Sequence, residues 1–403
     1  MASLHPVFSR LLPSLFVALV AVGCGATDAQ PGSGGGTAGA GGGEGTDAST
    51  TGSTGGRPST GADASHDTSA PGVDAADETS NPVSVIDAFS DAHVYFRGGS
   101  DNKRILDSTV TFPSMPATYK AITLRFSLRC PPLADGGCDH WDRRGFLGIV
   151  RRTGNTESVT ELLRFMTPYG VHANWTVDVT DLRPLLADDV KLRLFIDTWV
   201  APGSADGAGW LVDASFELVE GTPVRVPIAV LPLWDETSFD YGDPTKPVSS
   251  SVPPATVTIP AGATSVELRS FVTGHGQGNL DNCSEFCSKT HTLSIGAKSW
   301  PRTVWRNDCT TTTVAGQRGT FQYPRAGWCP GAVVYPWVEQ VTDAVTPGRD
   351  AVVSYDVEEY ANTCRPDSPM CAGCALGTPC AYDDGAHTKP VFILSSALIV
   401  YGR

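Results

Sequence analysis

Three short stretches far apart in the chain combine ionisable residues, aromatic residues and cysteines. They read CDHWDR at 138–143, CSEFC at 283–287 and RAGWCP at 325–330. Carboxylates can move protons, while arginines and aromatic rings can bind the hydroxyl groups and the apolar faces of sugars. Cysteines pair outside the cytosol, and such bridges would hold these groups in place. The three stretches therefore predict an exported protein with a cleft that handles a sugar.

Two of these stretches place a carboxylate beside a possible disulfide. A bridge across 130–138 would close a loop rich in Pro and Gly and fix the backbone just before Asp142. A bridge within 283–287 would remove little loop entropy, so we expect it to orient Glu285 rather than to stabilise the fold. The alternative for 130–138 is a disulfide-closed loop with solvated surface charges. The alternative for 283–287 is a CxxxC metal half-site.

Two further groups of residues fit a carbohydrate site. Asp197 and Trp199 are two residues apart on a predicted strand, so they project from the same face, together with Phe195. They could form the rim of a sugar site, or simply the end of a strand with a capped aspartate. Arg325 and Trp328 lie in a turn rich in Gly and Pro, which could also be a pinned loop whose Trp fills a gap.

The elements that must position these residues are predicted to be β-strands. Apolar residues alternate with polar ones over 121–129 and largely over 192–197, and in a third predicted strand Phe392, Leu394 and Ser396 face opposite Ile393, Ser395 and Ala397. Gly and Pro clusters separate the strands, and Gly221-Thr222-Pro223 marks the predicted domain boundary. We therefore predict an all-β fold of antiparallel sandwiches, with domains at 83–222 and 223–403.

The N-terminal residues are predicted to lie outside this fold. Arg10, an apolar run over 11–22 and small residues before Cys24 indicate a lipoprotein-type signal peptide over 1–24, although an ordinary secreted protein is the alternative. A lipid on Cys24 would attach the chain to a membrane. Residues 25–82 are mostly Gly, Ala, Ser, Thr and Asp and cannot bury enough apolar surface to fold, so we expect a disordered tether.

Charge and cysteine content exclude some classes of function. Residues 83–403 hold 27 Lys and Arg against 35 Asp and Glu, and this net charge of −8 argues against a nucleic-acid partner. Ten cysteines follow Cys24, an even number that indicates disulfides. Four of them, Cys364, Cys371, Cys374 and Cys380, lie in a hairpin-like extension over 364–380, where two disulfides or a zinc site are the alternatives.

The three opening stretches, in this order, resemble the peptide-N-glycosidase F family, whose members are glycan amidases. The resemblance implies two adjacent jelly-roll β-sandwiches with an active site in the cleft between them. Five more matching stretches carry it: VTFP at 110–113, RFMTPY at 164–169, VDVTDL at 177–182, DTW at 197–199 and THT at 290–292.

By this resemblance Asp142 is the essential carboxylate that activates the attack on the glycosylated amide. Glu285 is the second essential acid and Asp197 takes the place of a third. The implied substrate contacts are Arg143, Arg325, Trp199 and Trp328, with Trp141 and Phe286 beside the acids. The implied bridges are Cys130–Cys138, Cys283–Cys287 and Cys309–Cys329. The resemblance implies no cofactor and no metal, and a monomer that acts on N-linked glycoproteins or glycopeptides.

The sequence departs from the family pattern at several positions. Asp197 replaces a glutamate, Phe286 replaces a tryptophan, and an aromatic residue expected near 274–276 is absent. A shift of about 1 Å in a cleft can cost on the order of a hundredfold in rate. The rival hypothesis is therefore a glycan-binding surface lipoprotein without catalysis. A copper oxygenase on a similar fold is a third hypothesis. The sequence shows no cluster of His and Met ligands, and this argues against it.

Overall fold

The computed structural model of the protein describes residues 82–276, 283–362, 379–380, 385–386 and 389–402. The predicted signal segment with Cys24, nearly all of the predicted tether, and Cys364, Cys371 and Cys374 lie outside the described residues. The described part of the chain consists mainly of β-strands, as the alternation predicted. Among these residues, no helix is long and apolar enough to cross a lipid bilayer.

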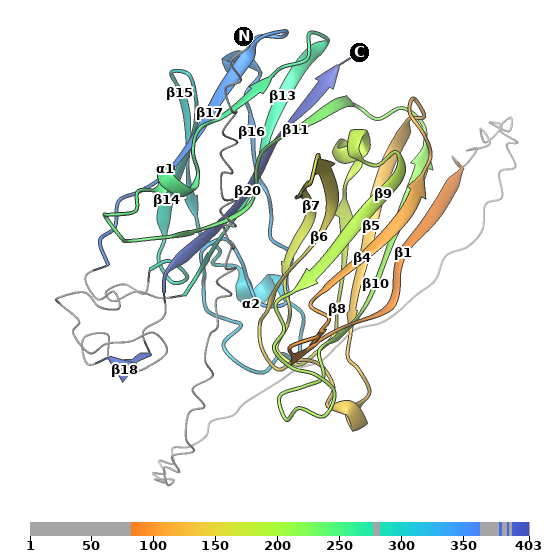
Figure 1. The fold of residues 1–403 in the computed structure, drawn as a ribbon, viewed down its shortest axis with the longest axis vertical. Helices are drawn as coiled ribbons and strands as arrows, with labels where there is room; N and C mark the ends of the chain where they lie inside the picture. The colour runs from red at the N-terminus through yellow and green to blue at the C-terminus, as the bar shows by residue number, and fades with distance from the viewer. Residues whose placement is uncertain (1–81, 277–282, 363–378, 381–384, 387–388, 403) are drawn as a thin grey trace, which may run out of the picture. The chain divides into compact units, whose positions relative to one another are not determined.

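The first half of the described chain forms a sandwich of two antiparallel four-stranded sheets (Figure 1). One sheet has the order β1-β10-β5-β8 and the other β4-β9-β6-β7. Their bounds are β1 (Val83–Val94), β4 (Ile105–Phe112), β5 (Tyr119–Arg129), β6 (Arg144–Thr153), β7 (Thr156–Met166), β8 (Ala173–Asp178), β9 (Asp188–Ile196) and β10 (Trp210–Glu220).

The second half repeats this topology. Its sheets have the orders β11-β20-β13-β16 and β12-β17-β14-β15. In each sandwich the first strand therefore pairs with the eighth, and the second with the seventh, which is the jelly-roll arrangement predicted above. The bounds are β11 (Val226–Asp240), β12 (Ala255–Thr258), β13 (Ala263–His275), β14 (Lys289–Ile295), β15 (Lys298–Val304), β16 (Trp337–Gln340), β17 (Asp350–Val357) and β20 (Val391–Gly402).

The remaining elements are short and lie in the connections. They are β2 (Phe96–Gly98), β3 (Asp101–Asn102), η1 (Leu133–Asp135), η2 (Thr180–Leu185), α1 (Val248–Ser251), α2 (Cys309–Thr312), η4 (Thr342–Ala344), β18 (Pro379–Cys380) and β19 (Gly385–Ala386). Residues 221–225, which include the predicted boundary, connect β10 to β11.

The alternating strands bury one face as expected. In β5 the side chains of Ile122, Leu124 and Leu128 are fully buried, while Arg125 and Arg129 on the opposite face are exposed. β20 differs, because nearly every residue of it is buried. Phe392 and Leu394 lie in the core of the second sandwich, whereas Ile399 and Tyr401 join the cluster of the first. β20 thus packs between the two sandwiches and is covered on both faces.

A buried arginine also joins the two sandwiches. Arg164, on β7, has no exposed side-chain surface and donates to both carboxylate oxygens of Glu161, at 2.9 and 2.7 Å. Its Nη1 crosses to the second sandwich, where it donates to Thr273 Oγ1 at 3.1 Å and to the carbonyl of Ile393 at 2.8 Å. These bonds fix the position of β7 against β13 and β20.

Candidate active site

Asp142 lies at the end of the loop that connects β5 to β6, and a buried carboxylate shapes this loop. The loop is closed by the Cys130–Cys138 disulfide. The side chain of Asp139 is completely buried and accepts hydrogen bonds from Thr198 Oγ1 at 2.7 Å and from Arg143 Nε at 3.0 Å. Because the Asp139 carboxylate also accepts from the backbone N–H of Trp141 at 3.0 Å, the loop turns sharply just before Asp142.

Two side chains contact the same oxygen of the Asp142 carboxylate. Its Oδ2 accepts a hydrogen bond from the Tyr169 hydroxyl at 2.7 Å and lies 3.8 Å from Arg325 Nη2. Oδ1 accepts neither of these contacts. The side chain is 17% exposed. Burial raises the pKa of Asp142 above its ordinary value, and the Tyr169 hydroxyl and the Arg325 charge oppose that rise.

Glu285 comes from the second sandwich and is fixed at both oxygens. It lies inside the Cys283–Cys287 disulfide loop. Oε1 accepts from Arg325 Nε at 3.1 Å, and Oε2 accepts from the backbone N–H of Gly276 at 3.2 Å. Burial raises the pKa of Glu285 to about 7, and the negative charge of Asp142 adds to the rise while Arg325 opposes it. At neutral pH this carboxyl group is therefore poised to hold or release a proton.

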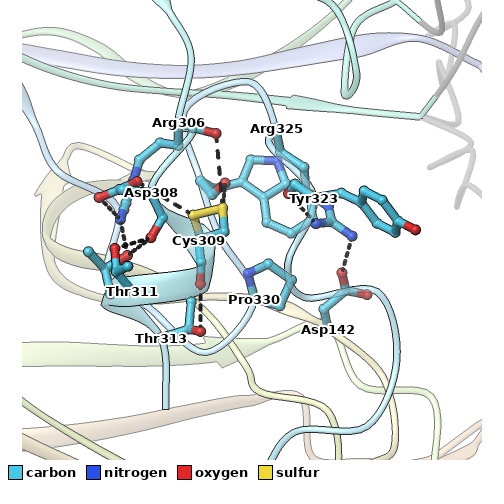
Figure 2. The surroundings of a disulfide bond; sticks show 12 residues. Asp142, Arg306, Asp308, Cys309, Thr311, Thr313, Tyr323, Arg325 and Pro330 are labelled. Atoms are coloured by element: carbon cyan, nitrogen blue, oxygen red, sulfur yellow. Dashed lines mark hydrogen bonds and ion pairs between the residues drawn. A yellow bond between two sulfur atoms is a disulfide. The ribbon is translucent and has the colours of Figure 1, made fainter. Parts of the chain in front are cut away.

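Arg325 connects the two acids. Its side chain is only 2% exposed, and Figure 2 shows its guanidinium group turned toward Asp142. Nη1 donates to the carbonyls of Thr320 and Tyr323, at 3.1 and 2.9 Å, and the Trp328 ring lies 4.8 Å from the guanidinium carbon. The Cys309–Cys329 disulfide pins the segment that carries these residues. The cation is therefore fixed between two carboxylates that come from different sandwiches.

Asp197 directly follows the end of β9. Its ion-pair partner is Arg104, whereas Asp142 and Glu285 share Arg325. The Asp197 carboxylate is 43% exposed and pairs with Arg104 Nη1 at 3.3 Å. The Arg104 guanidinium carbon also lies 4.3 Å from the ring centre of Trp199. The backbone N–H of Asp197 donates to the carbonyl of Arg144 at 2.9 Å, so the backbone at Asp197 lies next to the chain that leaves Asp142.

The predicted aromatic contacts differ in exposure. Trp141 is half exposed, and Trp199 and Phe286 are partly exposed. Trp328 is only 3% exposed and donates its indole N–H to the Gly274 carbonyl at 2.7 Å. Trp328 therefore packs behind Arg325 and leaves little surface for a sugar. The Nε of Arg143 is likewise engaged inside the protein, because it donates a hydrogen bond to the buried Asp139 carboxylate.

Three residues of this site are not predicted by the sequence patterns. Tyr169 is the hydrogen-bond donor to Asp142, Asp139 shapes the loop, and Arg104 pairs with Asp197. A signal existed for Tyr169, which ends the RFMTPY stretch, and for Asp139, which lies inside CDHWDR. Arg104 stands in a stretch without any such motif.

Within the described residues, one cluster brings together side-chain atoms of the kinds that bind metals. It consists of Asp308, Cys309 and Cys329. The two cysteines form a disulfide with each other, so neither offers the thiolate that a metal requires. Asp142 and Glu285 are held by Arg325, by the Tyr169 hydroxyl and by the backbone N–H of Gly276.

Comparisons with known proteins agree with this architecture. The family described as "Peptide-N-glycosidase F, N terminal" matches residues 144–208, and "Peptide-N-glycosidase F, C terminal" matches residues 244–371. A curated relative from Elizabethkingia miricola, a peptide-N(4)-(N-acetyl-beta-D-glucosaminyl)asparagine amidase F, is 28% identical over 270 residues, which is 64% of this chain and 73% of the relative.

Solved structures share the fold. The structure of PNGase F from Flavobacterium meningosepticum superposes with a TM-score of 0.65 at 22% identity, over 80% of this chain and 96% of that chain. The structure of PNGF-II gives a TM-score of 0.58 at 17% identity, over 80% of this chain and 66% of that chain. The matched regions contain Asp197, Glu285 and Arg325, whereas the N-terminal family match begins two residues after Asp142.

Proposed function

Because the chain belongs to the peptide-N-glycosidase F family, we propose that it hydrolyses the amide bond between asparagine and the first N-acetylglucosamine of an N-linked glycan. The observation that carries this proposal is the pair of carboxylates on one buried cation. Asp142 and Glu285 come from different sandwiches and share Arg325. Their different hydrogen-bond environments suit them to different steps of an amide hydrolysis.

Asp142 is proposed to activate the attacking water. Its Oδ2 is engaged by Tyr169 and faces Arg325, so Oδ1 is the oxygen that can accept a proton from a water molecule. The hydroxide equivalent then adds to the carbonyl carbon of the asparagine side chain. Arg325 lies where it can stabilise the negative charge that develops around this centre.

Glu285 is proposed to deliver the proton that the leaving nitrogen needs. Since its pKa is raised to about 7, a substantial fraction of the carboxyl is protonated at neutral pH. Proton transfer to the amide nitrogen lets the C–N bond break, so that the glycan leaves with its nitrogen and an aspartate remains on the peptide. The bonds from Arg325 and Gly276 keep the carboxyl in one orientation for this step.

We propose that the partly exposed aromatic rings and Asp197 bind the sugar. Trp141, Trp199 and Phe286 offer partly exposed faces for the apolar side of a sugar ring. Asp197 is shorter than the glutamate of the family, but its bond to Arg104 fixes its direction, and a bridging water can fill the remaining gap.

The proposal includes export of the chain and a lipid anchor at Cys24, with no cofactor and with the membrane contacted only through the lipid. The test is incubation of the purified protein with an N-glycopeptide, followed by mass spectrometry of both products. Released glycan together with conversion of asparagine to aspartate supports the amidase. Retained binding without conversion would support the rival, a glycan-binding protein without catalysis.

A further inference from the structure

A cavity of about 320 Å³ lies on the outer face of the β4-β9-β6-β7 sheet, beside the second sandwich. We propose that this cavity is a second sugar subsite, which receives a residue of the N-glycan beyond the sugar attached to asparagine. The inference rests on the proposed function and extends it from the reacting bond to the glycan. We call this cavity the distal subsite.

The floor of the distal subsite is one cross-strand row of apolar side chains. Ile105 on β4 pairs directly with Phe195 on β9, and Phe195 pairs with Phe146 on β6. The two phenyl rings are 5.4 Å apart, and Ile105 is 53% exposed. Phe146 is only 7% exposed, so Ile105 and Phe195 supply most of an apolar surface that can contact the C–H face of a sugar ring.

The distal subsite lies on the same face of the chain as the predicted sugar-binding acid. Asp197 is two residues beyond Phe195 and projects from the same face of the strand, and Arg104 stands beside it. Two residues along a strand correspond to about 7 Å, so neighbouring sugars of one glycan can contact Asp197 and the floor together. A glycan whose first residue contacts Asp197 and Trp199 would therefore place its next residues over this floor.

Ion-paired carboxylates form the walls. Asp235 and Glu236 come from β11 of the second sandwich, and Arg151 Nη2 donates to Asp235 at 2.8 Å. Arg144, whose guanidinium carbon lies 5.0 Å from the Phe195 ring centre, donates to Glu236 at 2.5 Å. The arginines hold these carboxylates in fixed directions and offset their charge. A carboxylate can accept several hydrogen bonds, so oxygens remain for the hydroxyl groups of a neutral sugar.

Two variants of the wall and floor test this inference, with a matched control. Ile105→Ala removes part of the floor, and Asp235→Ala removes one wall carboxylate that is 43% exposed. Thr109→Ala is the control, because Thr109 is an exposed residue on the same face of β4 outside the cavity. Each protein is assayed with two glycopeptides that share one peptide: one carries two N-acetylglucosamine residues, and the other carries the same core extended by mannose.

We expect Ile105→Ala and Asp235→Ala to raise KM for the extended substrate by about three- to tenfold, the loss of one contact or hydrogen bond. Their KM for the short substrate, and kcat for both substrates, should match those of wild type and Thr109→Ala. Equal effects on both substrates, or no effect on either, would overturn the distal subsite.

Binding separates failure of this inference from failure of the proposed function. If wild type released no glycan from either substrate, the amidase proposal would fail and the distal subsite would be tested by calorimetric titration with the free mannose-extended oligosaccharide. Weaker binding to Ile105→Ala than to Thr109→Ala would support the subsite. Equal affinity of the two variants would overturn it.

Discussion

Replacing Glu285 by glutamine should slow glycan release by at least about a hundredfold and remove a pH dependence from the stability of the fold. The cause is the buried position of the carboxyl group, which raises its pKa from the ordinary 4.5 to about 7. A carboxyl group of this kind binds its proton more tightly in the folded chain than in the unfolded chain. Its contribution to stability is therefore fully present below pH 4.5 and is lost as the pH rises through 7.

The size of this loss follows from the shift in pKa. Raising the pKa from 4.5 to about 7 corresponds to about 3 kcal/mol of folding free energy between pH 4 and pH 8. Glutamine has the same shape, can still accept a hydrogen bond from Arg325, and does not titrate. The unfolding free energy of Glu285→Gln minus that of wild type should therefore rise by about 3 kcal/mol over the same pH interval.

Urea unfolding at several pH values between 4 and 8 measures this difference directly. Glu220→Gln, at the exposed end of β10, controls for the loss of one negative charge. The same samples should show that Glu285→Gln releases glycan at least about a hundredfold more slowly than wild type, because it cannot donate a proton. A stability difference that stays constant with pH, or a variant with most of the wild-type rate, would refute the role given to Glu285.

Four further results are expected. Asp142→Asn should lower glycan release by at least about a hundredfold while leaving the circular dichroism spectrum unchanged, and a rate near wild type would refute its role as base. The wild-type kcat/KM should fall as the pH rises through about 7, because Glu285 loses its proton there, and a flat profile would contradict this. Asp197→Glu should retain or raise the rate in a mass-spectrometric time course, whereas binding without conversion in both proteins would favour the rival. Arg164→Met should lower the unfolding free energy by about 3–5 kcal/mol in urea, since it removes both hydrogen bonds that Arg164 donates to the buried Glu161 carboxylate, and a loss below about 1 kcal/mol would contradict that.

The fold could be predicted from the sequence because most strands bury one face. Alternation over 121–129 matches the buried and exposed sides of β5. β20 shows where the pattern is insufficient. Its residues alternate only weakly because both of its faces are covered, one by each sandwich. The nearly continuous apolar run over 391–402 is typical of a strand that is covered on both faces, but it does not show which surface provides the second cover.

The candidate site was predictable where short motifs carry it. Asp142 and Glu285 stand out beside their cysteines, and the three bridges implied by the resemblance are present in the structure. Residue type alone did not show how exposed each side chain is. Trp328 is buried behind Arg325, although its type suggested a sugar contact.

Some pairings also depend on chain folding over long distances. Arg104 reaches Asp197 across 93 residues because β4 and β9 are neighbours in one sheet. The sequence contains no local signal for such a pair. The Arg104–Asp197 pair follows only from the register of β4 and β9, which places Ile105 opposite Phe195.

The most direct test of the central claim is a mass measurement on one glycopeptide. The purified chain is incubated with a peptide that carries an N-linked glycan at a single asparagine, and the peptide product is weighed and fragmented. The proposed function predicts that the glycan is lost and that aspartate stands where asparagine was. A peptide that keeps its glycan, or one that keeps asparagine bearing a single sugar, would contradict the claim that this site cleaves the amide.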